Sequence, residues 1–268
     1  MSDAWSAVCA TEGTESLDVE SVCAPRVSAH LNPIDLHRSK SQQLLAMGQP
    51  DALQQTPTLG RLLVIGLVAA TEEYMRSVVA GVLRVCPYSR SESAPQMVSL
   101  GAVDYYEREE LARGIYEHVS FATASEVVKR TNSILGINTQ PSSSLFGALR
   151  EFDRLCQLRH ACAHSDGFLG HSNLRELGAR RGLGAQIVTI SFASLQSAGA
   201  ICYNTVRAYN RHVFRAVVER WLAEGEFEGS WTADRDRFSA LFKLFRSRSD
   251  SIGPSNAYHA YRTLPLET

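Results

Sequence analysis

Apolar side chains recur at helical intervals over two long segments of this sequence, and these segments restrict the fold more than any other feature. The first segment, Thr58–Val85, has its apolar face at Leu59, Leu62, Leu63, Leu67, Tyr74, Val78, Val82 and Val85. The second segment, Ser191–Ala223, has its apolar face at Leu195, Ala198, Cys202, Val206, Tyr209, Val213, Val217 and Trp221. Spacings of three and four residues place these side chains along one side of an α-helix, which other helices must then cover. The sequence therefore predicts an all-α fold, a bundle of packed helices.

The strong helical patterns lie in a central region with less regular sequence on both sides. Residues 1–57 are rich in Ser, Thr, Ala, Glu and Gln and have weak periodicity. We expect them to be a flexible or peripheral segment, in which the pattern allows a short helix around Ser39–Met47. Residues 58–225 are expected to form the main helical domain. Residues 226–268 are expected to form a C-terminal extension with one short helix that ends near Arg248.

Weaker patterns connect the long helices. Helices are expected over Tyr105–Val119 and Ser125–Leu135, because apolar residues again follow helical intervals there. The segment 171–190 is expected to be an irregular connection, with a short strand over Gln186–Ile190. The final 20 residues contain Gly253, Pro254 and Pro265 and are expected to be loose.

The charge of the chain limits the kinds of partner that it can bind. The net charge is −1 and the calculated pI is about 6.7, which argues against a protein that coats nucleic acid non-specifically. A local basic pocket is compatible with these values. The longest strongly apolar run, Leu62–Ala70, is far shorter than the roughly 20 residues that cross a bilayer, so no membrane partner is expected.

Six cysteines are present, and none forms a C-x-x-C pair. The first residues of the chain lack a basic stretch followed by an apolar one, the pattern of a secretory leader. Cys86, Cys156, Cys162 and Cys202 lie in apolar surroundings. We therefore expect a cytoplasmic protein in which these cysteines act as small core residues.

A third helix, expected to begin near Ser142–Ser144, carries a charged residue on its apolar face. Its stripe consists of Leu145, Leu149, Phe152 and Cys156, and the same stripe continues to Arg159. A buried guanidinium without a partner is costly, so Arg159 requires a carboxylate, carbonyl groups, a ligand or an open interface. A structural ion pair with Glu72 or Glu73 on the first long helix is one way to meet this requirement.

The segment Glu151–Gly167, EFDRLCQLRHACAHSDG, resembles the late helix of the HEPN superfamily (higher eukaryotes and prokaryotes nucleotide-binding). In that superfamily an Arg and a polar residue are followed by a few small residues and then a His, as Arg159, His160 and His164 are here. The helical order of Thr58–Ala223 resembles the same domains. Many members are ribonucleases of bacterial defence or toxin systems, so the resemblance implies RNA cleavage and a regulatory or antitoxin partner protein. Members paired with nucleotidyltransferase antitoxins commonly have a Tyr where this chain has Asp166.

The residue types of this motif suit RNA cleavage without a metal ion or other cofactor. When a 2′-hydroxyl attacks the adjacent phosphate, His164 suits proton transfer because histidine titrates near neutrality. Arg159 suits stabilisation of the extra negative charge. Five residues separate the two along the helix, so they converge poorly within one protomer. The resemblance implies a homodimer whose interface gathers both copies, with His160 as a polar helper. From their positions we also expect Asp166 and Glu73 to have supporting roles.

Other interpretations of the same residues stay open. His160 and His164 have a four-residue spacing found in metal sites, which Asp166 or Cys162 would complete. The chain would then be a metalloenzyme; alternatively, it is a non-catalytic module that binds RNA, nucleotide or a protein. A stripe of Arg207, Arg211 and Arg215 recurs every four residues on the last long helix. It is expected either to follow an RNA backbone or to be a solvated face with nearby acids.

Overall fold

The structure is a computed structural model that describes residues 8–9, 13–25, 32–107, 110–116, 119–140, 143–179, 184–250, 253 and 256–265. The chain divides into two units, Met1–His30 and Leu31–Thr268. In the first unit the described residues contain one short helix, α1 (Val19–Val22), whose first turn is capped by the Asp18 side chain. Among the residues described, no helix is both long enough and apolar enough to cross a membrane.

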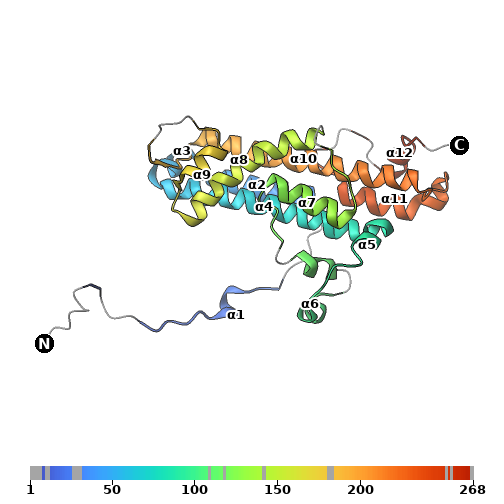
Figure 1. Ribbon diagram of the computed structural model, residues 1–268, viewed down its shortest axis with the longest axis horizontal. Helices are drawn as coiled ribbons and strands as arrows, with labels where there is room; N and C mark the ends of the chain where they lie inside the picture. The colour runs from blue at the N-terminus through green and yellow to red at the C-terminus, as the bar shows by residue number, and fades with distance from the viewer. Residues whose placement is uncertain are drawn as a thin grey trace. The chain divides into compact units, whose positions relative to one another are not determined.

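The second unit is helical, which confirms the predicted all-α class (Figure 1). In chain order its helices are α2 (Pro33–Met47), α3 (Pro50–Gln55), α4 (Pro57–Val85), α5 (Pro87–Glu92), α6 (Leu100–Tyr105), η2 (Leu111–Tyr116), α7 (Ala124–Leu135), α8 (Ser144–His164), α9 (His171–Glu176), α10 (Phe192–Ala223), α11 (Trp231–Phe245) and α12 (Ala257–Tyr261). Two short strands, β1 (Phe168–Leu169) and β2 (Gln186–Ile187), pair antiparallel, with Phe168 opposite Ile187. The expected strand over Gln186–Ile190 is thus present but shorter.

Helix α4 lies at the centre of this unit and packs against α2, α8, α10 and α11 (Figure 1). Two glycines of α4 allow close approach. Gly66 lies against Leu44 of α2, and Gly81 lies so close to Leu244 of α11 that a Cβ there would clash. Helix α2 therefore covers the first half of α4, and α11 covers the second half.

The end of α11 meets the start of α2. The Asn32 side chain accepts from the backbone N–H of Asp35 and donates to the carbonyl of Arg246. The Asp35 carboxylate is buried and accepts hydrogen bonds from the Ser247 hydroxyl at 2.5 Å and from the Arg248 N–H at 2.8 Å. Burial acts to raise the pKa of Asp35, but these hydrogen bonds outweigh it and the pKa is lowered. The residues after α11 are thereby fastened to the first turn of α2.

The boundaries expected at residues 57 and 225 differ from those observed. Helix α2 buries Ile34 and His37, so a large part of the segment 1–57 belongs to the core rather than to a peripheral segment. Polar residues contribute to this buried face, which is why its apolar periodicity is weak. Phe238 and Leu241 of α11 join the same core, so the expected extension 226–268 is an integral part of the unit.

The helix expected over Tyr105–Val119 is not formed. Helix α6 ends at Tyr105, and the 3-10 helix η2 begins at Leu111. The 3-10 helix η2 is wound more tightly than an α-helix. Its Arg113 guanidinium pairs with Glu73 of α4 at 3.0 Å. The short helix α12 also lies where a loose terminus was expected. Its Tyr261 hydroxyl donates to buried Asp234 of α11 at 2.5 Å.

Three cysteines are core residues, as predicted from their apolar surroundings. Cys86, Cys156 and Cys202 are buried, whereas Cys162 is only half-buried. Burial raises the pKa of the Cys202 thiol to about 12 and that of Cys156 still further. All four are free thiols in this structure.

Candidate functional site

Helix α8 carries the Arg-His motif and lies between α4 and α10. Its buried face consists of Leu145, Leu149, Phe152, Leu155, Cys156 and Ala161. The helix ends because the backbone turns into the left-handed region, with φ of +47° at Asp166 and +84° at Gly167. The N–H groups of Ser165 and Gly167 both donate to the Ala161 carbonyl, at 3.0 and 2.9 Å. The motif therefore occupies the last two turns before a sharp reversal of the chain.

Arg159 is half-buried on this helix, and its Nε atom is buried without a hydrogen-bond partner among the described residues. The acids considered as its partners are engaged elsewhere. Glu72 pairs with Arg76 at 2.8 Å, and Glu73 pairs with Arg113 at 3.0 Å. The structural ion pair considered for Arg159 is therefore not formed, and Glu73 supports η2 rather than Arg159. The Arg159 guanidinium is therefore a partly desolvated cation without an ion-pair partner among the described residues.

His160 and His164 are exposed on the same side of α8, one turn apart, with ring centroids 4.8 Å from each other. Asp166 does not turn toward them. Its carboxylate accepts from the Arg61 guanidinium of α4 at 2.8 Å, and its backbone carbonyl accepts from the same group. No group of three or more His, Cys, Asp or Glu side chains that could hold a metal ion occurs among the residues described.

The directions of Arg159 and His164 differ around the helix axis. Five residues at about 100° each amount to about 500°, which is a net rotation of about 140°. The two side chains therefore leave α8 on different sides, as the sequence spacing suggested. A ligand bound on one side of a single α8 can therefore contact the guanidinium or the imidazole, but it does not easily contact both.

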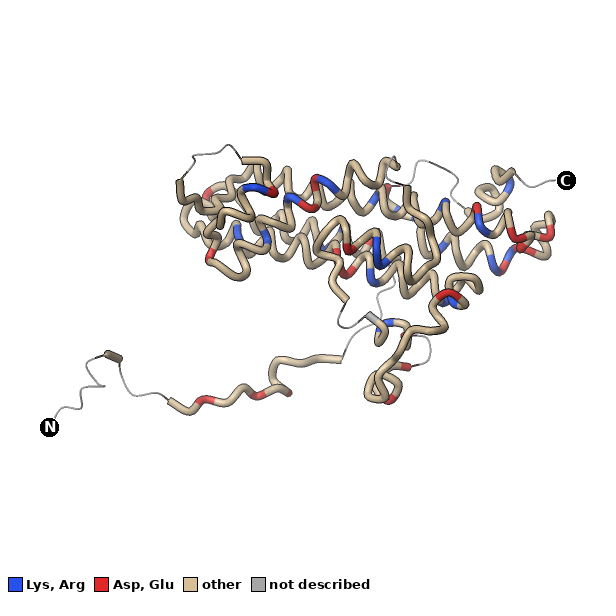
Figure 2. The backbone as a smooth tube through the Cα atoms, in the orientation of Figure 1, with Lys and Arg blue, Asp and Glu red and all other residues tan. Residues whose placement is uncertain are grey.

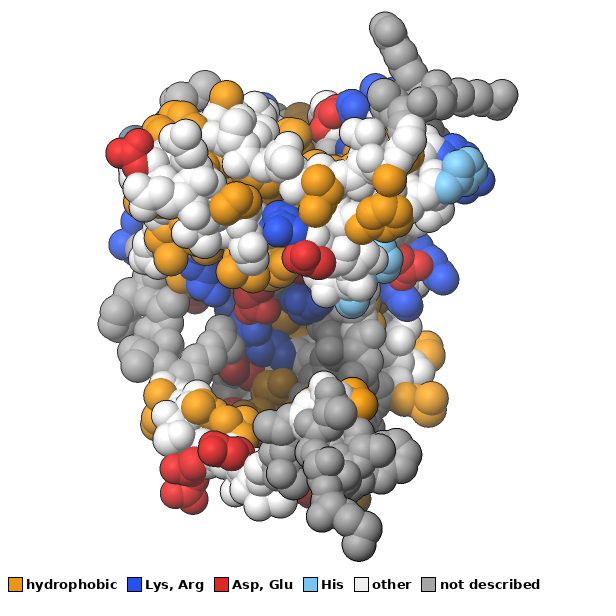
Figure 3. Space-filling view, turned by 90° about the vertical axis from the view of Figure 1, so that its left-hand side faces the viewer, with side chains coloured by type: hydrophobic (Ala, Val, Ile, Leu, Met, Phe, Trp, Pro, Cys, Tyr) orange, Lys and Arg blue, Asp and Glu red, His pale blue; other side chains and the backbone are white. Residues whose placement is uncertain are grey.

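Large apolar side chains are exposed at the same end of the unit. They are Leu62 on α4, Phe168 on β1, Ile187 on β2 and Phe192 at the start of α10. Phe168 and Ile187 are directly paired across the two strands, so their side chains lie on one face of the ribbon. Figure 3 looks onto this end and shows hydrophobic side chains in separate groups, with charged side chains and histidines beside them.

The three arginines of α10 do not form one continuous basic stripe. Arg207 is neutralised by Asp250, and Arg215 pairs with Glu219 at 2.6 Å. Arg211 has neither a hydrogen bond nor an ion pair with any residue that the structure describes. Figure 2 shows the same mixture more widely, with basic residues interspersed with acidic residues along the helices.

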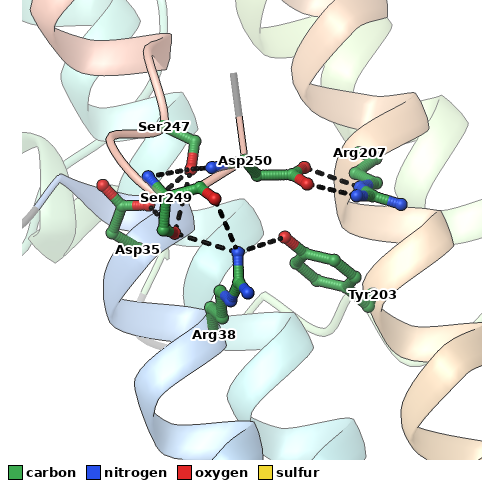
Figure 4. A network of polar contacts seen from close by, with 7 residues as sticks. All are labelled: Asp35, Arg38, Tyr203, Arg207, Ser247, Ser249 and Asp250. Carbon is green, nitrogen blue, oxygen red and sulfur yellow. Dashed lines mark hydrogen bonds and ion pairs between the residues drawn. The ribbon is translucent and has the colours of Figure 1, made fainter. Parts of the chain in front are cut away.

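A polar network near these arginines, partly buried and partly exposed, was not anticipated from the sequence (Figure 4). The Arg38 guanidinium donates to the Ser249 carbonyl at 3.1 Å and to the Tyr203 hydroxyl at 3.5 Å. The Arg207 guanidinium lies over the Tyr203 ring, 4.4 Å from its centroid. The sequence does indicate one part of the network, because Asn32 followed three residues later by Asp35 is a pattern typical of a helix start. Its partners after α11 are more than 200 residues away in sequence, which no local pattern indicates.

Comparisons of this chain with family models, with curated proteins and with solved structures found no match.

Proposed function

We propose that this protein is a metal-independent endoribonuclease of the HEPN type, with Arg159 and His164 as its catalytic residues. The observation that supports this most directly is the state of Arg159, a half-buried guanidinium whose Nε has no partner among the described residues. Keeping such a group costs stability, and a site that binds a phosphodiester gives a reason to keep it. His160 and His164, exposed and one turn apart on the same helix, supply imidazoles, the side-chain groups that enzymes use most often for proton transfer.

In the proposed reaction the 2′-oxygen of a ribose forms a bond to the adjacent phosphorus, and the bond from phosphorus to the 5′-oxygen breaks. The products are a 2′,3′-cyclic phosphate and a free 5′-hydroxyl. His164 accepts the proton of the 2′-hydroxyl, and a second imidazole donates a proton to the departing 5′-oxygen. Arg159 pairs with the non-bridging oxygens as negative charge accumulates on them. In this proposal His160 orients the substrate or His164.

The proposal includes a homodimer, because about 140° of rotation separates Arg159 from His164 on one helix. A two-fold contact at this end of the unit brings two copies of α8 together and surrounds one cleft with both kinds of side chain. The exposed apolar residues Leu62, Phe168 and Ile187 supply surface for such a contact. Unregulated RNA cleavage harms the cell that makes the enzyme, so the proposal includes a regulatory partner protein that inhibits the activity.

A cleavage assay tests the catalytic proposal. Labelled single-stranded RNA is incubated with the purified protein in EDTA, beside His164→Ala and Arg159→Ala. The matched controls are His171→Ala and Arg154→Ala, which remove an exposed His from α9 and an exposed Arg from α8. We expect cleavage that survives chelation, falls at least about 100-fold in the two site variants and is unchanged in the controls.

Other outcomes contradict the proposal in different ways. Cleavage that EDTA abolishes indicates a metalloenzyme using His160 and His164. If no RNA is cleaved but RNA is bound, the chain is a binding module. Light scattering tests the dimer separately: Phe168→Glu is expected to produce monomers, whereas Met97→Glu, at an exposed apolar residue before α6, is expected to leave the dimer intact. A monomeric wild-type protein with full activity is incompatible with a shared cleft.

A further inference from the structure

A cleft opens beside α10 where the end of α11 meets the start of α2. Its volume is about 650 Å³, within the roughly 300–1,000 Å³ typical of small-molecule sites. Ile34 of α2, Ser144 of α8, one side of α10 and the last turn of α11 line it. We attribute its existence to the two shorter helices, α2 and α11, which cover successive halves of α4 and leave an opening next to their junction.

The cleft is positively charged. Arg207, Arg211 and Arg246 line it, and Asp250 is the one acid among its lining residues, so the charge is three positive against one negative. Asp250 is already bound to Arg207, with 2.6 Å between Oδ2 and Nε (Figure 4). The Arg211 guanidinium is exposed and has no partner among the described residues. One cationic group in the cleft is therefore available to a ligand.

Aromatic rings form the apolar part of the wall. Phe214 and Phe242 are half-buried, so each presents part of its ring to the cleft. The Phe214 and Phe245 ring centroids lie 5.5 Å apart, and the Arg246 guanidinium lies 6.0 Å from the centroid of Phe242. A flat apolar group placed here contacts ring faces on two helices. The lining of the cleft thus combines aromatic side chains with cationic ones.

We infer that this cleft binds a small organic anion, with an aromatic body and one oxyanionic head group, either carboxylate or phosphate. The head group pairs with Arg211, and the body lies against Phe214 and Phe242. The pair formed by Asp250 and Arg207 is an internal example of the same recognition, an oxyanion held by a guanidinium fork at the edge of this cleft.

The local charges favour a small anion over an RNA strand. A strand that follows α10 needs successive free cations, but Arg215 is paired with Glu219 at 2.6 Å and does not line the cleft. The Asp250 carboxylate next to Arg207 adds repulsion for a second phosphate. The site is also separate from the proposed nuclease site, because Ser144 and Arg159 are 15 residues apart on α8, or about 22 Å along its axis.

Calorimetric titration of the full-length protein tests the inference. The probe is 1-naphthyl phosphate, and uncharged 1-naphthol and inorganic phosphate are titrated in parallel. We expect Arg211→Ala to weaken binding of 1-naphthyl phosphate about 10-fold to 100-fold. Arg215→Ala, one helical turn away and paired with Glu219, is the matched control and should bind like wild type. Asp250→Asn should strengthen binding about two- to tenfold, because it releases Arg207 for the head group.

Three results overturn the inference. The first is equal binding by wild type and Arg211→Ala. The second is binding of 1-naphthol as tight as that of the phosphate, which indicates an apolar pocket without anion recognition. The third is Arg211-dependent binding of a short single-stranded RNA with no binding of 1-naphthyl phosphate. Because binding is measured directly, a failure here leaves the ribonuclease proposal untouched, and an inactive nuclease leaves this inference untouched.

Discussion

Protonation of His37 is predicted to destabilise the fold in mildly acidic solution. The side chain is 2% exposed, on α2. Its Nε2 lies 3.2 Å from the Thr71 hydroxyl, which itself donates to the Leu67 carbonyl and so accepts from the imidazole. The Nδ1 atom is buried without a partner among the described residues. Adding a proton there buries a charged N–H with no acceptor, and burial, with a smaller effect of Lys40, lowers the pKa of His37 to about 4.

The sign and the magnitude follow from linkage between proton binding and folding. The folded pKa is depressed, so between about pH 4 and pH 6.5 the unfolded chain binds the proton and the folded chain does not. Stability is complete above pH 6.5 and falls as the pH falls. A depression of about 2.5 pH units at about 1.4 kcal/mol each gives a total loss of about 3 kcal/mol, of which about 2 kcal/mol is lost by pH 5.

Urea denaturation followed by circular dichroism at pH 7.5, 6 and 5 measures this loss. His37→Gln removes the titrating group while its amide can still donate to Thr71, and His171→Gln is the matched exposed control. Wild type and His171→Gln should lose about 2 kcal/mol more than His37→Gln between pH 7.5 and pH 5. Other groups, such as Asp35, titrate in all three proteins and cancel in the comparison. Parallel pH profiles for wild type and His37→Gln would refute the reasoning.

Three further changes test other parts of the structure. Arg159→Met should raise the free energy of unfolding by about 1 kcal/mol while abolishing cleavage, because it removes a buried unsatisfied Nε; a loss of stability in urea denaturation would show that Arg159 has a structural partner. Asp35→Asn should cost about 2–3 kcal/mol, since charge-assisted hydrogen bonds to Ser247 and Arg248 are lost; a thermal midpoint equal to wild type would contradict this. Phe152→Ala should lower the free energy of unfolding, measured by urea denaturation, by about 3–5 kcal/mol because the ring is fully buried. Arg154→Ala on the same helix should change it by less than about 0.5 kcal/mol. Equal effects of the two substitutions would show that the buried face of α8 is assigned wrongly.

The long helices could be predicted from the sequence because their buried faces are almost wholly apolar. The expected segments Thr58–Val85 and Ser191–Ala223 correspond to α4 and α10, with first residues that differ by one and the same last residues. Helix α2 was recognised only in part, over Ser39–Met47, because its buried face includes Asp35 and His37. Periodicity detects burial of apolar side chains, and it misses burial that hydrogen bonds make acceptable.

The candidate site was predictable only as a local motif. The sequence placed Arg159, His160 and His164 at the end of one helix, and it indicated that Arg159 falls on an apolar face. It left open whether Glu72 or Glu73 pairs with Arg159, because the competing cations on α4 and η2 depend on tertiary packing. For the cleft beside α10, the sequence indicated only that Arg207 and Arg211 share one side of a helix, and it did not indicate the cleft itself. The cleft is built from α2, α8, α10 and α11, which come together only in the folded chain.

The junction between α11 and α2 has a practical consequence for dividing the chain into fragments. The side chains that hold the first turn of α2 bond to groups supplied after Phe245, so each end of the unit completes the other. A fragment that stops at Phe245 leaves the Asp35 carboxylate without its hydrogen-bond donors, Ser247 and Arg248. A fragment that begins after Asp35 leaves these donors without their acceptor. The smallest piece that folds by itself should therefore start no later than Asn32 and extend at least through Asp250.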